Sequence, residues 1–157
     1  MKRLAKLFIT LLSLVGLGAV VFLLGMRRKN PLLVDAVRRF TKEVVNPQQM
    51  ESAGQPGAYA AVIEHKGRKS GKAYRTPIGV SPHGDDFITM LPYGRRSDWL
   101  QNILAVGSAT ILFEGESYSV DRLEVVPLNA ARLDDKDRKL ARLFGVSECL
   151  KMHKVSA

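Results

Sequence analysis

The chain has 157 residues, of which 46% are hydrophobic and 25% charged, and this suits one globular domain with a substantial core. Its net charge of +9 does not indicate nucleic-acid binding, because the basic residues gather around the first apolar segment and in one glycine-rich stretch rather than on a continuous face. Cys149 is the only cysteine, which excludes an intramolecular disulfide and a cysteine-rich metal site and fits a reducing compartment.

Residues 1–29 are predicted to be a membrane anchor with basic flanks. Residues 7–26 carry no charge and are mostly Leu, Val, Ile and Phe, and about 20 such residues match a ~30 Å hydrocarbon core. A cleaved signal peptide and a buried core helix are the alternatives, but the apolar run is long for the first and too uniformly apolar for the second. We therefore expect one transmembrane helix in the cell membrane, with the body on the cytoplasmic side.

Residues 30–57 are predicted to form an amphipathic helix and a linker. Asn30 is a favourable N-cap, and Pro31 suits the first helical position. One apolar stripe follows at helical spacing, formed by Leu33, Val37, Phe40 and Val44. Pro47 is expected to end this helix, and residues 48–57 to form a loop.

Residues 58–157 are predicted to form an α+β body that is mainly antiparallel β. About six short strands are expected, which favours a small barrel or open sandwich over a βαβ sheet. A helix should begin after the N-cap Ser97 and end at Gly107, and a shorter helix should cover residues 134–144 with Leu140, Leu143 and Phe144 inward. The expected strands are residues 58–65, 77–81, 87–91, 109–113, 117–126 and 148–155.

The stretch from Gly67 to Pro77 combines glycines, a serine and basic residues without an acidic one. It lies between two apolar runs and is predicted to connect two strands. Glycines let the backbone approach a ligand, while N–H groups, a hydroxyl and cationic side chains bind oxyanions. A ligand with phosphate or carboxylate groups would fit, although a solvated basic turn has the same composition.

Other familiar chemistry is missing from the sequence. It contains neither the glycine fingerprints of dinucleotide and P-loop sites nor a nucleophile elbow. His65, His83 and His153 lack metal-ligand spacing and are interpreted as surface or strand-end residues, so no metal site is predicted. An enzyme of this composition would depend on a cofactor for its reactive group.

Three segments together resemble one family: residues 67–71 with 75–77, then 91–94, then 98–105. In this order they are similar to the deazaflavin-dependent nitroreductases and quinone reductases, and the likeness covers roughly residues 58–126. The resemblance implies a split β-barrel related to flavin-binding proteins. It also implies the cofactor coenzyme F-420, a deazaflavin with a phosphate and an oligoglutamate tail.

The resemblance assigns roles to individual residues. Arg68, Lys69 and Ser70 would hold the phosphate and tail carboxylates, with Gly71 permitting close approach and Arg75 adding charge. Tyr93 is the candidate proton donor. The residues that would border the deazaflavin ring are Thr76, Pro77, Ile78, Leu91, Pro92, Tyr93, Gly94, Trp99 and Asn102.

The implied reaction is hydride transfer from the reduced deazaflavin to a lipophilic acceptor, a quinone or a nitro compound, and this barrel class often forms homodimers. In place of the tyrosine-rich C-terminal region of well-known members, residues 143–152 here are aliphatic, which leaves the acceptor open. A non-catalytic module that binds a lipid or fatty acid, or a binder of FMN or haem on the same barrel, are the alternatives.

Overall fold

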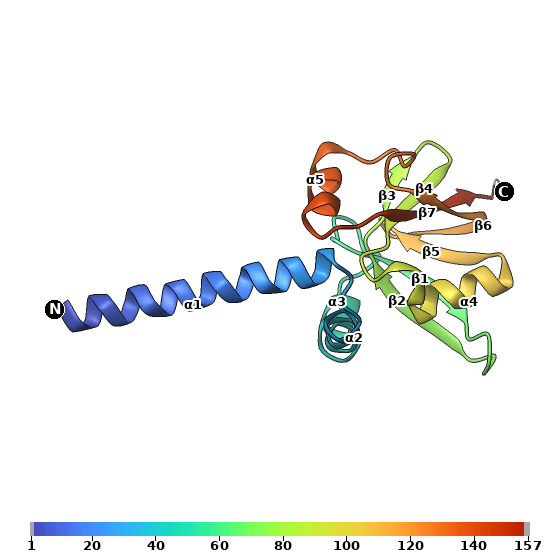
Figure 1. Ribbon diagram of the computed structural model, residues 1–157. Coiled ribbons are helices and arrows are strands. Elements are labelled where there is room, and N and C mark those ends of the chain that lie inside the picture. The colour runs from blue at the N-terminus through green and yellow to red at the C-terminus, as the bar shows by residue number, and fades with distance from the viewer. Residues whose placement is uncertain (1, 156–157) are drawn as a thin grey trace.

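The computed structural model describes the backbone of residues 2–155 and the side chains of residues 13–155. Its body is one antiparallel sheet in the order β2-β1-β5-β6-β7-β4-β3, curled into a half-barrel (Figure 1). The mainly antiparallel α+β class is thereby confirmed, with seven strands in place of about six. The strands are β1 (Ala61–Lys66), β2 (Ala73–Ile78), β3 (Ser81–His83), β4 (Asp86–Met90), β5 (Ala109–Phe113), β6 (Glu116–Pro127) and β7 (Glu148–Lys154).

Strand β2 differs from its prediction, which placed a strand at residues 77–81. The hairpin register pairs Lys66 with Ala73 and Ala61 with Ile78, so β2 begins four residues earlier and the glycine loop shrinks to residues 67–72. The first three residues of β2 are exposed, and its last two, Pro77 and Ile78, are buried. An edge strand tolerates this mixture because half of its surface faces solvent, whereas the sequence pattern resembles a loop.

Helix α4 (Asp98–Val106) packs its buried apolar side chains against the concave side of the sheet. Leu100 and Ile103 are fully buried and pack with residues of β1, β4, β5 and β7. Ser97 occupies the predicted N-cap, and Gly107 ends the helix with φ +84° while its N–H donates to the carbonyl of Ile103 at 2.7 Å. Glycine is favoured at this left-handed C-terminal position because it has no Cβ, so both predicted ends are confirmed.

The second helical segment is longer than predicted. The Asn30 side chain caps α2 (Pro31–Phe40), accepting hydrogen bonds from the N–H groups of Leu32 and Leu33 at 3.1 and 3.3 Å. The chain then continues through a π-helical turn, η1 (Thr41–Val45), into α3 (Asn46–Met50). Pro47 therefore does not end the helix. Proline has no N–H to donate to the preceding turn, and the wider π-helical turn before it shifts the hydrogen-bonding pattern so that the chain continues as a helix.

Two predicted apolar faces are wrong. In α2 the buried side chain is Val34, whereas Phe40 is 57% exposed and Val44 of η1 is 42% exposed. In α5 (Asp135–Leu143) Ala141 is buried and Leu143 is 45% exposed. Helical periodicity indicates that an apolar face exists but not which of its residues meets the body.

Helix α1 (Lys2–Arg27) projects away from the body and meets it only near its C-terminal end (Figure 1). From residue 14 to residue 24 its large apolar side chains other than Leu23 are exposed, Leu17 to 61%. Among the described residues, no helix combines the length and apolar character needed to cross a membrane. The predicted transmembrane helix is therefore not supported, and the side chains of residues 7–12 of that predicted span lie outside the described part of the chain.

The base of α1 is fixed by close backbone packing. Met26 is buried at this end. Gly145, which follows α5, has φ +62°, and a Cβ placed on it would lie 2.8 Å from the Cα atom of Arg27. A side chain at this position would require the two backbones to separate.

We expect Gly145→Ala to destabilise the protein more than Gly84→Ala. Both glycines have positive φ, but a Cβ on Gly84 would meet no atom within 4 Å. The left-handed conformation should cost each variant about 1 kcal/mol or more, and the contact with Arg27 should add about 1–3 kcal/mol to Gly145→Ala alone. Urea unfolding measures both losses, and equal losses would contradict the packing at the base of α1.

Candidate functional site

A cavity of about 730 Å³ lies between the glycine loop, the segment α2–η1 and the start of α4. Its lining combines cationic side chains with aromatic and apolar ones. The basic residues are Arg38, Arg39, Lys42, Arg68 and Lys69, and the acidic residues are Asp35, Glu43 and Asp98. Tyr74, Pro77, Tyr93 and Trp99 contribute apolar surface. The cavity therefore suits a ligand that has both a flat apolar part and negative charge.

The glycine loop, residues 67–72, is a tight turn closed by its own backbone. The N–H of Gly71 donates to the carbonyl of Gly67, and the N–H of Gly67 donates to the carbonyl of Lys72, both at 2.8 Å. A Cβ on Gly67 would lie 2.6 Å from Ser70 Oγ and 2.8 Å from the Tyr74 ring. A side chain at residue 67 would therefore have to displace the Ser70 and Tyr74 side chains. Glycine is favoured at residue 71 by the φ of +66°.

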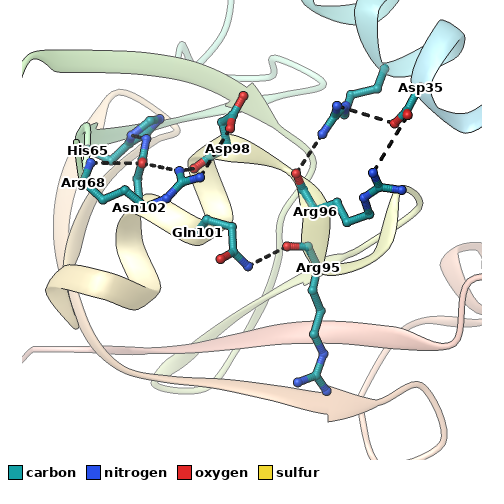
Figure 2. Close-up of polar contacts among 9 residues, drawn as sticks. Asp35, His65, Arg68, Arg95, Arg96, Asp98, Gln101 and Asn102 are labelled. Carbon is teal, nitrogen blue, oxygen red and sulfur yellow. Dashed lines mark hydrogen bonds and ion pairs between the residues drawn. The ribbon is translucent and has the colours of Figure 1, made fainter. Parts of the chain in front are cut away.

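A buried amide joins this loop to α4. Asn102, 5% exposed, accepts through Oδ1 a hydrogen bond from the Arg68 N–H at 3.1 Å and another from Arg68 Nη1 at 2.8 Å. Its Nδ2 lies 3.2 Å from Nδ1 of His65 on β1. Figure 2 shows the three side chains converging, with Asp98 on the other side of the Arg68 guanidinium at 3.7 Å. The amide therefore determines where the cationic loop lies.

His65 belongs to the site, although the sequence interpretation placed it among ordinary surface or strand-end residues. Its Nε2 lies 3.2 Å from Thr76 Oγ1, and its ring stacks on that of Tyr74. Burial lowers the pKa of His65 below its ordinary value. The available signal was its position on a strand two residues before Gly67, which places the ring beside the glycine loop.

The segment α2–η1 forms the facing side of the cavity, and sequence reasoning did not assign it to the site. Thr41 Oγ1 and the Tyr93 hydroxyl are 2.9 Å apart. Arg38 donates to the carbonyl of Arg96 at 2.8 Å, and Asp35 lies between these two arginines (Figure 2). The π-helical turn begins at Thr41, and such turns often occur at functional positions.

The structure brings some of the predicted site residues together and leaves others apart. Eight line the cavity: Arg68, Lys69, Ser70, Thr76, Pro77, Tyr93, Trp99 and Asn102. Six do not: Gly71, Arg75, Ile78, Leu91, Pro92 and Gly94.

Four residues of the second group have other contacts that explain their absence from the lining. Arg75 pairs with Glu64 at 3.0 Å on the exposed part of the hairpin. Ile78 and Leu91 are buried in the core, and the carbonyl of Pro92 accepts a hydrogen bond from Lys29 Nζ at 2.9 Å. Strand alternation separates neighbours such as Pro77 and Ile78 onto opposite faces.

A second cavity, of about 890 Å³, lies between β3 and residues 129–138. Its polar side chains largely bond to one another: Ser81 donates to Asp137 at 2.6 Å, and Arg132 lies 3.3 Å from His83 Nε2. Within the described residues there is also no group of three or more His, Cys, Asp or Glu that could hold a metal ion. The first cavity is therefore the candidate site.

The solved structures that match this chain are distant from it in sequence. One titled "F420 Reductase" is 9% identical with a TM-score of 0.45, covering 68% of this chain and 92% of its own. An F420-H2 dependent reductase, FDR-A, is 11% identical with a TM-score of 0.40, covering 60% and 94%. A putative pyridoxamine 5'-phosphate oxidase from Listeria innocua is 7% identical with a TM-score of 0.44, covering 70% and 90%. No curated protein matches the chain.

The family match covers both sides of the candidate cavity. The family described as F420H(2)-dependent quinone reductase matches residues 33–144, which is well over half of the chain and includes most of α2, the glycine loop and α4. The chain belongs to this family, and it is therefore an oxidoreductase whose cofactor is coenzyme F-420.

Proposed function

We propose that this oxidoreductase passes a hydride from reduced coenzyme F-420 to a lipophilic quinone, and that the cavity beside the glycine loop holds the cofactor. The observation that carries the proposal is the lining of the cavity, where cationic loop residues adjoin aromatic and apolar surface. Phosphate and glutamate carboxylates match the first part, and a deazaflavin ring matches the second. The family membership favours this activity over a non-catalytic lipid-binding module.

Some charged side chains around the cavity form ion pairs within the protein, and others do not. Asp98 lies beside Arg68, and Asp35 lies beside Arg38 and Arg96. Lys69 has no hydrogen-bond or ion-pair partner among the described residues, and its side chain borders the cavity. A bound anion would therefore be stabilised most by Lys69, because that side chain would not have to give up an ion pair within the protein. Arg68 would bind the anion from the position in which its hydrogen bonds to Asn102 hold it.

The protein's own contribution to the reaction would be positioning and proton transfer. The bound cofactor supplies the hydride, and reduction of a quinone to a hydroquinone then also needs a proton at oxygen. Tyr93 lines the cavity and has its hydroxyl 2.9 Å from Thr41 Oγ1. Thr41 can donate to the Tyr93 oxygen as that hydroxyl gives up its proton, which stabilises the developing phenolate. We assign Tyr93 as the proton donor.

We further propose that the body works against a lipid surface, with α1 as the contact. Leu14, Leu17, Val21 and Leu24 share one face of α1 and are 46–61% exposed, and Val15 and Phe22 extend the apolar surface around the helix. Leu32, at the base of α1, is 82% exposed. Apolar surface of this extent is characteristic of a membrane or partner contact, and a quinone dissolved in lipid would reach the protein from the same side.

Lys69→Ala should weaken binding of coenzyme F-420 by about tenfold, because one charge-assisted contact to the anionic tail is lost without disturbing the Arg68–Asn102 bonds. A fluorescence titration measures the affinity, with FMN as the comparison ligand. Lys139→Ala on α5 removes the same charge away from the cavity and should bind normally. Equal affinities for the two variants would contradict the cofactor site.

Tyr93→Phe should lower kcat for quinone reduction by about 100-fold or more, in the range of general-acid contributions, while the affinity for coenzyme F-420 changes little. Steady-state oxidation of the reduced cofactor by a water-soluble quinone gives kcat. Tyr59→Phe is the control, because Tyr59 is 82% exposed and lies outside the cavity lining. An unchanged kcat in Tyr93→Phe would refute its role as proton donor.

The full-length protein should float with anionic phospholipid vesicles in a density gradient, and a double variant, Leu17→Lys with Val21→Lys, should not. Both substitutions put charge on exposed apolar positions, so the body should keep its affinity for coenzyme F-420. Val106→Lys places a charge on another exposed apolar residue, 57% exposed on α4, and should float like the wild type. Wild-type protein that stays at the bottom of the gradient would rule out the lipid contact.

A further inference from the structure

The orientation of the Asn102 amide can be identified from its contacts with Arg68. Two donors, the Arg68 N–H and Nη1, point at the same atom of the buried side chain, at 3.1 and 2.8 Å. That atom must be the oxygen, because an amide nitrogen in its place would direct its own hydrogens at both donors. The Nδ2 group of Asn102 consequently faces His65 Nδ1 as a donor, at 3.2 Å.

This orientation in turn determines the protonation state of His65. Because Nδ1 must accept from Asn102, the imidazole proton lies on Nε2, where it donates to Thr76 Oγ1 at 3.2 Å. An imidazolium would carry N–H groups on both nitrogens and would direct one of them at the Asn102 NH₂ group. The chain of hydrogen bonds from Thr76 to Arg68 is therefore consistent only with a neutral His65.

The surroundings of His65 also favour the neutral ring. Tyr74 of β2 stacks on it, with ring centroids 5.7 Å apart. Arg68 of the glycine loop lies across Asn102, and Asp98 of α4 is engaged by the Arg68 guanidinium. The same cavity is lined by Lys69 from the loop and, from the facing helix, by Asp35, Arg38, Arg39, Lys42 and Glu43. No carboxylate of the described residues bonds to the imidazole, and burial lowers its pKa.

We propose that His65 is a positioning residue of the cofactor site: as the neutral Nε2–H tautomer it holds the Asn102 amide in the orientation that fixes Arg68 and the glycine loop for binding an anion. The proposal rests on the assignment of this cavity to coenzyme F-420. His65 itself acts through Asn102, and protonating it would force the amide to rotate and give up its hydrogen bonds to Arg68.

The pH dependence has a definite sign. The folded protein favours neutral His65, so it takes up the proton at a lower pH than the unfolded chain does, whose ordinary pKa is 6.5. The contribution to stability is complete above about pH 6.5 and is lost as the pH falls from there through the lowered pKa. Positioning of the glycine loop should weaken at the acid end of this window.

Two substitutions of His65 separate positioning from simple packing. His65→Asn can place an acceptor oxygen where Nδ1 lies but cannot titrate, whereas His65→Leu fills space without accepting a hydrogen bond. The first readout is hydrogen exchange of the Arg68 amide in the cofactor-free, full-length protein, and the second is the affinity for coenzyme F-420. Both are measured from about pH 8 to about pH 5, a range that spans ordinary histidine titration.

We expect His65→Leu to lose about fivefold in protection of the Arg68 amide and in cofactor affinity at neutral pH, the effect of one lost hydrogen bond. His65→Asn should match the wild type at neutral pH and should lack the wild type's decline below pH 6.5. Any titration of the cofactor is common to both proteins, so the difference between them isolates His65.

Two results would overturn the positioning role: wild-type protection of the Arg68 amide in His65→Leu, or a wild-type pH profile in His65→Asn. Failure of the underlying site assignment is distinguishable from these. If the variants change protection of the Arg68 amide as expected but leave the affinity for coenzyme F-420 unchanged, the positioning role stands and the cofactor binds elsewhere.

Discussion

The buried amide of Asn102 is the interaction on which the geometry of the site depends. It connects three elements that are far apart in the sequence, namely strand β1 through His65, the glycine loop through Arg68, and α4 on which it lies. An unsatisfied amide at 5% exposure would cost about 1–3 kcal/mol. The hydrogen bonds therefore favour one arrangement of loop and helix. The hydrophobic packing of Leu100 and Ile103 beneath then holds α4 in the half-barrel.

The features that could be predicted from the sequence are those determined by local chemistry. Asn30 caps α2 and Gly107 ends α4 as expected, because capping depends on a residue and its immediate neighbours. The glycine loop was found for the same reason. Gly67 and Gly71 meet steric and conformational requirements within the hairpin itself. Arg68, Lys69 and Asn102, to which the resemblance gave a role in cofactor binding, line the candidate cavity.

What could not be predicted depends on contacts between distant segments. The sequence pattern around His65 is that of an ordinary strand end, and its role appears only when β1 lies beside α4. Pro47 is a strong helix-ending signal, yet the π-helical turn before it carries the chain on into α3. The exposure of Phe40 and Val44 follows from the same segment facing the cavity and solvent rather than the core. No local rule contains that information.

The base of α1 is tied to the segment that bears Tyr93. Lys29, just after α1, donates to the carbonyl of Pro92 at 2.9 Å, and burial lowers the pKa of its ammonium group while the nearby Glu148 opposes that shift. Arg38 reaches the carbonyl of Arg96 on the other side of the same segment. If α1 rests on a lipid surface as we propose, these two bonds keep the Tyr93 hydroxyl at a constant height above it. A quinone leaving the lipid would then reach a proton donor that is held in the cavity lining, while the anionic tail of the cofactor stays at the glycine loop.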